Sequence, residues 1–116
     1  MAARAAHVTT DPVILNWQQY LAEEGWGGVW ARDGLARKYR SLITITALTA
    51  AGKSHELGLH FVGAMRNGWS REELGEALIH MSSYVGYPSV VEAFRVLETV
   101  FTENPDLNPA KSDGAI

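Results

Sequence analysis

The chain has 116 residues, of which 47% are apolar and 20% charged, enough for one folded domain with a core and too few for a multidomain enzyme. Its formal net charge of -3 argues against nucleic acid as a partner, because binding to a phosphate backbone requires a basic surface. The sequence contains no cysteine, which excludes disulfide scaffolds, thiolate metal sites and thiol nucleophiles.

The N-terminal residues carry no targeting signal. Residues 1–10 lack the apolar core of a secretory signal, and no apolar run in the chain is long enough to span a bilayer. We therefore expect a cytoplasmic protein without a membrane partner. Residues 1–10 are predicted to be a flexible N-terminus, residues 11–102 one domain, and residues 103–116 a flexible, polar C-terminal tail.

The first predicted helix covers residues 12–24. Asp11 fits an N-cap and Pro12 the first helical position. Apolar residues then recur at helical spacing: Val13, Ile14, Trp17, Tyr20 and Leu21. Three glycines at positions 25, 27 and 28 predict a break, followed by an aromatic loop around Trp26 and Trp30 that can line a pocket or a subunit contact.

Four more helices are expected further along the chain. Residues 35–51 form an apolar segment that Gly52 ends, and Ser54 is expected to cap a third helix over residues 55–67. Ser70 and Glu73 have the spacing of a capping box, which predicts a fourth helix up to Val85. The Gly86-Tyr87-Pro88 segment ends that helix and begins a fifth, which continues through Phe101.

Two pairs of titratable residues have helical spacing. Glu56 and His60 lie four residues apart, so they share a helix face, and a carboxylate beside an imidazole equips it to donate or accept a proton. The alternative is a partly exposed ion pair, which contributes little. Glu76, His80 and Tyr84 repeat the pattern on the fourth helix, where His80 is alternatively an ordinary hydrogen-bonded histidine and Tyr84 a core or interface ring.

The packing of these helices decides whether the residues meet. If the third and fourth helices form an antiparallel hairpin, both histidines face one cavity, and Arg40 enters it from the second helix. A guanidinium there would bind a carboxylate; the alternative is a salt bridge, for example with Glu56. No HExxH or similarly specific spacing is present, so no metal site is predicted.

Five ordered segments of the chain resemble the carboxymuconolactone decarboxylase family. The match covers about residues 11–102 and rests on residues 30–35, 40–44, 56–60, 64–68 and 84–88. The resemblance implies an all-α fold, an AhpD-like helical bundle of about five to six helices. It also implies a homotrimer or homohexamer with sites near the subunit contacts.

The resemblance also separates two branches of chemistry. The alkylhydroperoxidase AhpD branch uses a CxxC pair, and its cysteine positions fall on Lys53 and Glu56, so thiol peroxidase activity is impossible here. The decarboxylase branch implies a carbon–carbon lyase that converts 4-carboxymuconolactone to 3-oxoadipate enol-lactone and CO2 in aromatic-compound degradation. This reaction needs no cofactor, because the conjugated lactone of the substrate takes up the electron pair that decarboxylation leaves behind.

The hypothesis assigns a role to each residue of the site. His60 delivers the proton, Glu56 orients His60, and His80 contacts an oxyanion or carboxylate. Arg40 binds the substrate's carboxylate, and Trp30 and Tyr84 form pocket walls. Asp33 departs from the proline common in the family, so the substrate can differ. The alternatives are a related lactone or enol-lactone hydrolase or isomerase, and a non-catalytic oligomer that binds a small acid.

Overall fold

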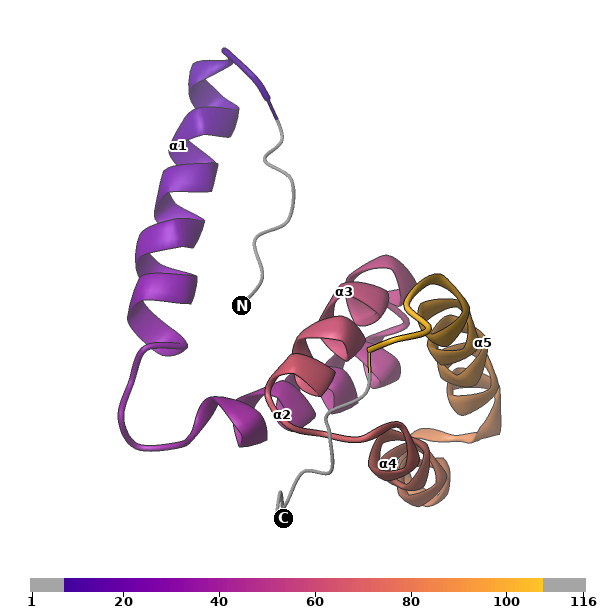
Figure 1. Cartoon of the computed structure of the whole chain (residues 1–116). Coiled ribbons are helices and arrows are strands. Elements are labelled where there is room, and N and C mark those ends of the chain that lie inside the picture. Colours follow the sequence, from indigo (N-terminus) through magenta and orange to yellow (C-terminus); the bar gives the residue numbers. More distant parts are fainter. Residues whose placement is uncertain (1–7, 108–116) are drawn as a thin grey trace. The chain divides into compact units, whose positions relative to one another are not determined.

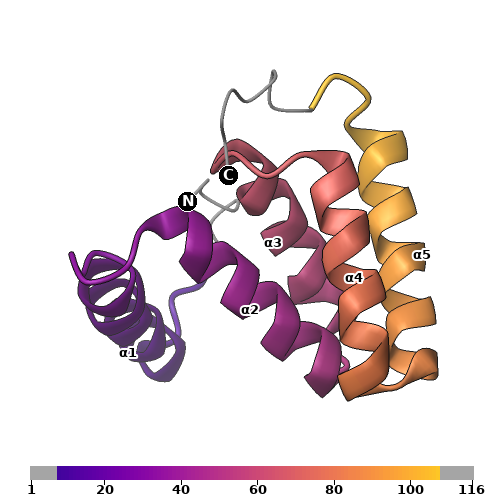
Figure 2. The ribbon, with the colours of Figure 1, turned by 90° about the horizontal axis from the view of Figure 1, so that it is seen from below.

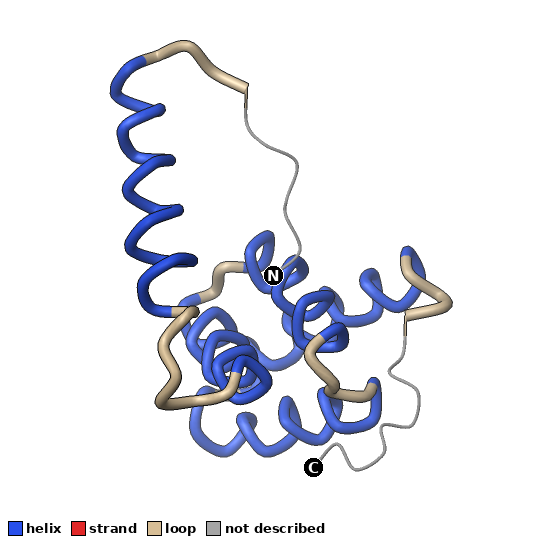
Figure 3. Tube along the Cα trace, turned by 60° about the vertical axis from the view of Figure 1, so that its left-hand side comes forward, coloured by secondary structure: helices blue, strands red, loops and turns tan. Residues whose placement is uncertain are grey.

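A computed structural model of the chain describes residues 8–107. These residues form five α-helices and one π-helix joined by short connections, with no strand among them (Figure 3). The predicted all-α fold class is therefore confirmed. The chain divides into two compact units, Met1–Arg37 and Lys38–Ile116. Most of the two predicted flexible ends, residues 1–7 and 108–116, lies outside the described residues.

The first unit contains α1 (Pro12–Tyr20) and the π-helix η1 (Leu21–Val29). Asp11 is the N-cap as predicted, since its carboxylate accepts a hydrogen bond from the Val13 N–H at 2.9 Å. The predicted break at Gly25 is wrong, because the helix continues through all three glycines. A β-carbon at Gly27 would lie 3.1 Å from the carbonyl oxygen of Ala22, so this backbone suits a residue without a side chain.

The second unit contains α3 (Ser54–Arg66), α4 (Arg71–Val85) and α5 (Tyr87–Glu103), and α2 (Arg37–Ala51) begins at its boundary (Figure 1). Both α3 and α4 pack along α5, and α4 and α5 run side by side (Figure 2). The α3 and α4 helices thus pack more closely on α5 than on each other, and α5 provides the surface on which both bury their apolar faces.

The core draws on all four helices of this unit. Its fully buried large side chains are apolar except for one serine: Ile45, Leu57, Phe61, Leu74, Leu78 and Ser41. Burying such aliphatic and aromatic side chains is the main stabilising contribution to a helical domain of this size. Within the described residues, no helix combines the length and the apolarity needed to cross a membrane.

Local sequence features explain two helix boundaries of the second unit. The predicted capping box is present, with the Glu73 N–H donating to Ser70 Oγ at 3.1 Å and the Ser70 N–H donating to Glu73 Oε1 at 2.9 Å. Gly86, with φ of 104°, separates α4 from α5 and adopts a conformation that favours glycine. Both boundaries follow from a few adjacent residues, so the sequence could predict them.

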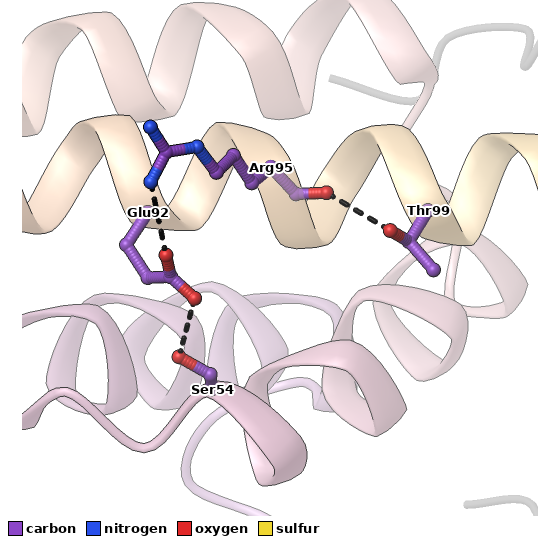
Figure 4. Close-up of polar contacts among 4 residues, drawn as sticks. All are labelled: Ser54, Glu92, Arg95 and Thr99. Carbon is purple, nitrogen blue, oxygen red and sulfur yellow. Dashed lines mark hydrogen bonds and ion pairs between the residues drawn. The ribbon is translucent and has the colours of Figure 1, made fainter.

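The expected cap at Ser54 is wrong. Lys53 is the N-cap of α3, and no side chain caps that helix end. The Ser54 hydroxyl instead donates to Glu92 Oε2 on α5 at 3.1 Å, and Glu92 also pairs with Arg95 at 3.6 Å (Figure 4). A carboxylate on a neighbouring helix thus competes successfully for the hydroxyl that the local pattern assigned to the cap.

The first residues of the predicted C-terminal tail are held against the second unit. Arg71 Nη2 donates to the carbonyl oxygens of Asn104 and Pro105 at 3.3 and 3.1 Å. The same guanidinium lies 4.4 Å from the centre of the Phe101 ring, and Leu107 packs against the core. The beginning of α4 and the end of α5 are therefore fastened together.

Candidate active site

The candidate site is built on an antiparallel hairpin of α2 and α3. At the closed end, Gly52 adopts φ of 71°, and the Lys53 N–H donates to the Leu48 carbonyl oxygen at 3.0 Å. At the open end, Asn67 Nδ2 donates to Ser41 Oγ at 2.8 Å. Because both ends are fixed, the beginning of α2 lies beside the end of α3.

The first row of site residues lies on α3. Glu56, His60, Gly63 and Asn67 follow one another at spacings of four, three and four residues, which places them on one helix face. Glu56 and His60 are half-buried, and the Nδ1 atom of His60 is buried. Both side chains are therefore partly exposed, which fits a proton-transfer pair and a partly exposed ion pair alike.

The second row lies on α2 and contains Arg40, Thr44 and Leu48, all half-buried. Thr44 Oγ1 donates to the Arg40 carbonyl oxygen at 2.8 Å. Asn67, which marks the level of Ser41, is 67 − 60 = 7 residues from His60, or about 10 Å along the helix axis. The backbones of Arg40 and His60 thus occupy different levels of the hairpin.

The predicted residues of α4 lie elsewhere. Leu74, Leu78 and Met81 fill the core, and His80 and Tyr84 are exposed, with their rings 5.3 Å apart. The expected cavity shared by the two histidines is therefore wrong within the described part of the chain, because the apolar stripe of α4 turns the other face outward. Tyr84, with a relative exposure of 79%, is not a core ring in this chain.

Trp30 belongs to the first unit. It ends η1 and is half-buried, and its ring centroid lies 5.5 Å from that of Trp26 in a tilted arrangement. The two rings form the predicted aromatic cluster, although they stand on a helix and its cap instead of a loop. The role of Trp30 as a pocket wall remains a prediction.

Sequence reasoning missed three polar groups that shape the hairpin. Ser41, Asn67 and Trp69 hydrogen-bond across its open end or to the adjoining turn of α2. An asparagine at the end of a helix gives no sign in the sequence of a partner 26 residues away. In the described range, no three or more His, Asp and Glu side chains are grouped so that they could hold a metal ion.

Comparison with known proteins gives a consistent group of relatives. The model of the carboxymuconolactone decarboxylase family matches residues 16–99. The chain is 39% identical over 88 residues to a 4-carboxymuconolactone decarboxylase of Acinetobacter baylyi, an alignment that covers 76% of this chain and 66% of that protein. It is 40% identical over 95 residues to the nitrosuccinic acid decarboxylase npaB of Metarhizium robertsii, covering 82% and 66% of the two chains.

A third relative has no named activity. An uncharacterized 15.0 kDa protein of Paracoccus denitrificans is 30% identical over 88 residues, covering 74% of this chain and 66% of that protein. The chain thus spans about two thirds of the length of each of these curated relatives.

Proposed function

Because the chain belongs to the carboxymuconolactone decarboxylase family, we propose that it is a carbon–carbon lyase that removes CO2 from a small carboxylated substrate. Two relatives named as decarboxylases, at 39% and 40% identity, support this reaction class. The observation that carries the proposal is the half-buried Glu56–His60 pair on the hairpin that also presents Arg40. These groups are the acid and the anion-binding cation that such a reaction requires.

The leading substrate is 4-carboxymuconolactone, with 3-oxoadipate enol-lactone as the product. The bond between the ring and its carboxylate carbon breaks, and its electron pair moves through the ring double bond to the lactone carbonyl. A proton must then reach a ring carbon of the resulting dienolate, while CO2 leaves. Nitrosuccinic acid is the second substrate to test, because a relative of similar identity is named as a nitrosuccinic acid decarboxylase.

The residues of the hairpin divide this work. Arg40 binds a substrate carboxylate through its guanidinium, and His60 delivers the proton to carbon. Glu56, one helical turn before His60, orients the imidazole for this transfer. Stabilising the dienolate more strongly than the substrate lowers the barrier of the step.

The exposed residues belong to a larger assembly in this proposal. The chain forms a homotrimer or homohexamer, in which His80 contacts an oxyanion or carboxylate near a subunit contact. Trp30 and Tyr84 form pocket walls. The exposed His80–Tyr84 ring pair and other exposed aromatic rings, such as Tyr87, support association, since monomers rarely expose large apolar patches.

The first test follows ultraviolet absorbance and CO2 release when the protein meets freshly generated 4-carboxymuconolactone, with nitrosuccinic acid in a parallel assay. The wild type is expected to turn over one of these acids. The turnover rate of His60→Gln is expected to be lower by a factor of about 10² or more. His55→Gln is the matched control, because His55 lies on the same helix but on an exposed face.

Each contrary result has a distinct meaning. Unchanged turnover by His60→Gln would remove His60 from the mechanism. No CO2 from either acid with a folded protein would contradict the decarboxylase proposal. Hydrolysis or isomerisation in a panel of lactones would then favour the related lactone enzyme, and ligand binding without any reaction would favour the non-catalytic oligomer.

A further inference from the structure

The turn of α2 that carries Arg40 is held from outside its own helix. Trp69 Nε1 donates to the carbonyl oxygen of Lys38 at 2.7 Å, and Asn67 Nδ2 donates to Ser41 Oγ at 2.8 Å. Arg40 lies between these two anchored positions, two residues after Lys38 and one before Ser41. Both donors come from the short segment that connects α3 to α4.

Each anchor has one buried partner. Ser41 is 1% exposed and Trp69 is 8% exposed, whereas Asn67 and Lys38 are half-buried, so both hydrogen bonds are partly shielded from water. The indole is also packed from two sides, with Lys38 Nζ 4.5 Å from its ring centroid and Tyr39 in an edge contact at 6.1 Å. These contacts fix the position of the N–H that reaches Lys38.

The side chain of Asn67 is not needed to end α3. Its backbone N–H already donates to the last carbonyl oxygens of that helix, including Gly63 and Ala64. Gly68, with φ of 112°, then turns the chain so that Trp69 can return to α2. The amide of Asn67 and the indole of Trp69 therefore both act on α2.

Two anchors, one on each side of Arg40, fix the position of this turn along the helix axis and its rotation about that axis. The direction of a helical side chain depends on both. A guanidinium that binds a carboxylate through a fork has strict angular demands, and small displacements of such positioning groups are costly. Holding this turn therefore holds the base of the Arg40 side chain.

We propose that Asn67 and Trp69 are positioning residues that aim Arg40 at the substrate's carboxylate and thereby set the affinity for carboxylated ligands. This inference rests on the proposed function, in which Arg40 is the anion-binding residue. It adds two residues, neither of which touches the substrate, to the determinants of binding.

Trp69→Phe gives the most direct test, because it keeps an aromatic ring in this place and removes the N–H donor to Lys38 together with the second ring of the indole. KM for the carboxylated substrate is expected to rise about tenfold, the order expected for one partly buried hydrogen bond, with kcat within about twofold. Asn67→Ala should have the same effect. Glu98→Gln, on the exposed face of α5, is the control and should leave KM unchanged.

A double-mutant cycle with Arg40→Ala separates positioning from general stability. In the Arg40→Ala background, Trp69→Phe should leave KM unchanged, because there is no guanidinium left to aim. A merely structural role would instead lower the melting temperature and change KM equally in both backgrounds. That result, or an unchanged KM for Trp69→Phe alone, would overturn the proposal.

A binding assay keeps this test separate from the reaction. Titration with succinate, a dicarboxylate that the proposed step does not consume, should show weaker binding by Trp69→Phe, again only when Arg40 is present. If the wild type binds succinate in this way but decarboxylates nothing, the proposed function fails and the positioning role stands. If the wild type binds no succinate and turns over no acid, Arg40 does not bind carboxylates and the positioning role fails.

Discussion

At the scale of single residues, the negative charge of Glu56 can be removed with little change in the size of the side chain. Glu56→Gln keeps the size of the side chain and its ability to hydrogen-bond, but it no longer stabilises a protonated imidazole one turn away. We expect kcat to fall about tenfold, with a smaller change in KM, because the carboxylate acts on proton delivery and not on binding. Steady-state kinetics on the turned-over acid measure both quantities.

The matched control is Glu98→Gln on the exposed face of α5, which removes the same charge away from the hairpin and should leave kcat unchanged. If Glu56→Gln changes KM but not kcat, Glu56 acts on substrate binding. If it changes neither, Glu56 has no part in the reaction.

The sequence predicted the part of the site that depends on one helix. Glu56 and His60 share a face because an α-helix places residues i and i+4 together wherever it packs. The exposure of His80 could not be predicted from the sequence, because this exposure depends on which face of α4 meets α5. The Asn67–Ser41 hydrogen bond was also out of reach, because the two residues are 67 − 41 = 26 positions apart.

At the scale of elements, the capping box of α4 yields a stability prediction. Ser70→Ala removes the hydroxyl that accepts from the Glu73 N–H, and such losses cost about 1 kcal/mol. For a domain of this size, we expect the melting temperature to fall by about 4–8 °C. Thermal unfolding followed by circular dichroism measures this shift.

Ser83→Ala tests whether that loss is specific to the cap. Ser83 lies on the exposed face of the same helix, so its removal should change the stability by less than about 0.5 kcal/mol. Equal melting temperatures for Ser70→Ala and the wild type would mean that the capping box does not stabilise α4.

Two elements show where local rules are overruled. Three glycines within four residues normally interrupt a helix, yet η1 continues through Gly25, Gly27 and Gly28. Glycine in a helix costs only about 1 kcal/mol per residue, and here the π-helical backbone leaves little room for a side chain. Ser54 has the residue type of a cap but hydrogen-bonds to Glu92 on another helix.

At the scale of the whole molecule, the order of helices was predictable and their pairing was not. Short connections favour hairpins of consecutive helices. The α4 and α5 helices pack in this way, and hydrogen bonds join the two ends of the α2–α3 pair. The α3–α4 connection is also short, but α3 packs on α5 instead. Its residues Asn67 and Trp69 hydrogen-bond to α2, so this connection joins α2 to the rest of the unit.

The last prediction concerns association between copies of the chain. No residue of α1 is buried, although α1 carries apolar side chains along one stripe, among them Trp17 at 54% exposure and Tyr20 at 60%. A single helix cannot cover such a stripe by itself. If this stripe packs against a second copy, Trp17→Asp combined with Tyr20→Asp should lower the molar mass in light scattering from that of a trimer or hexamer towards that of a monomer.

Asn16→Asp adds a charge to an exposed polar position of the same helix and should leave the molar mass unchanged. A monomeric wild type, or an assembly that the double variant leaves intact, would show that the stripe does not join subunits.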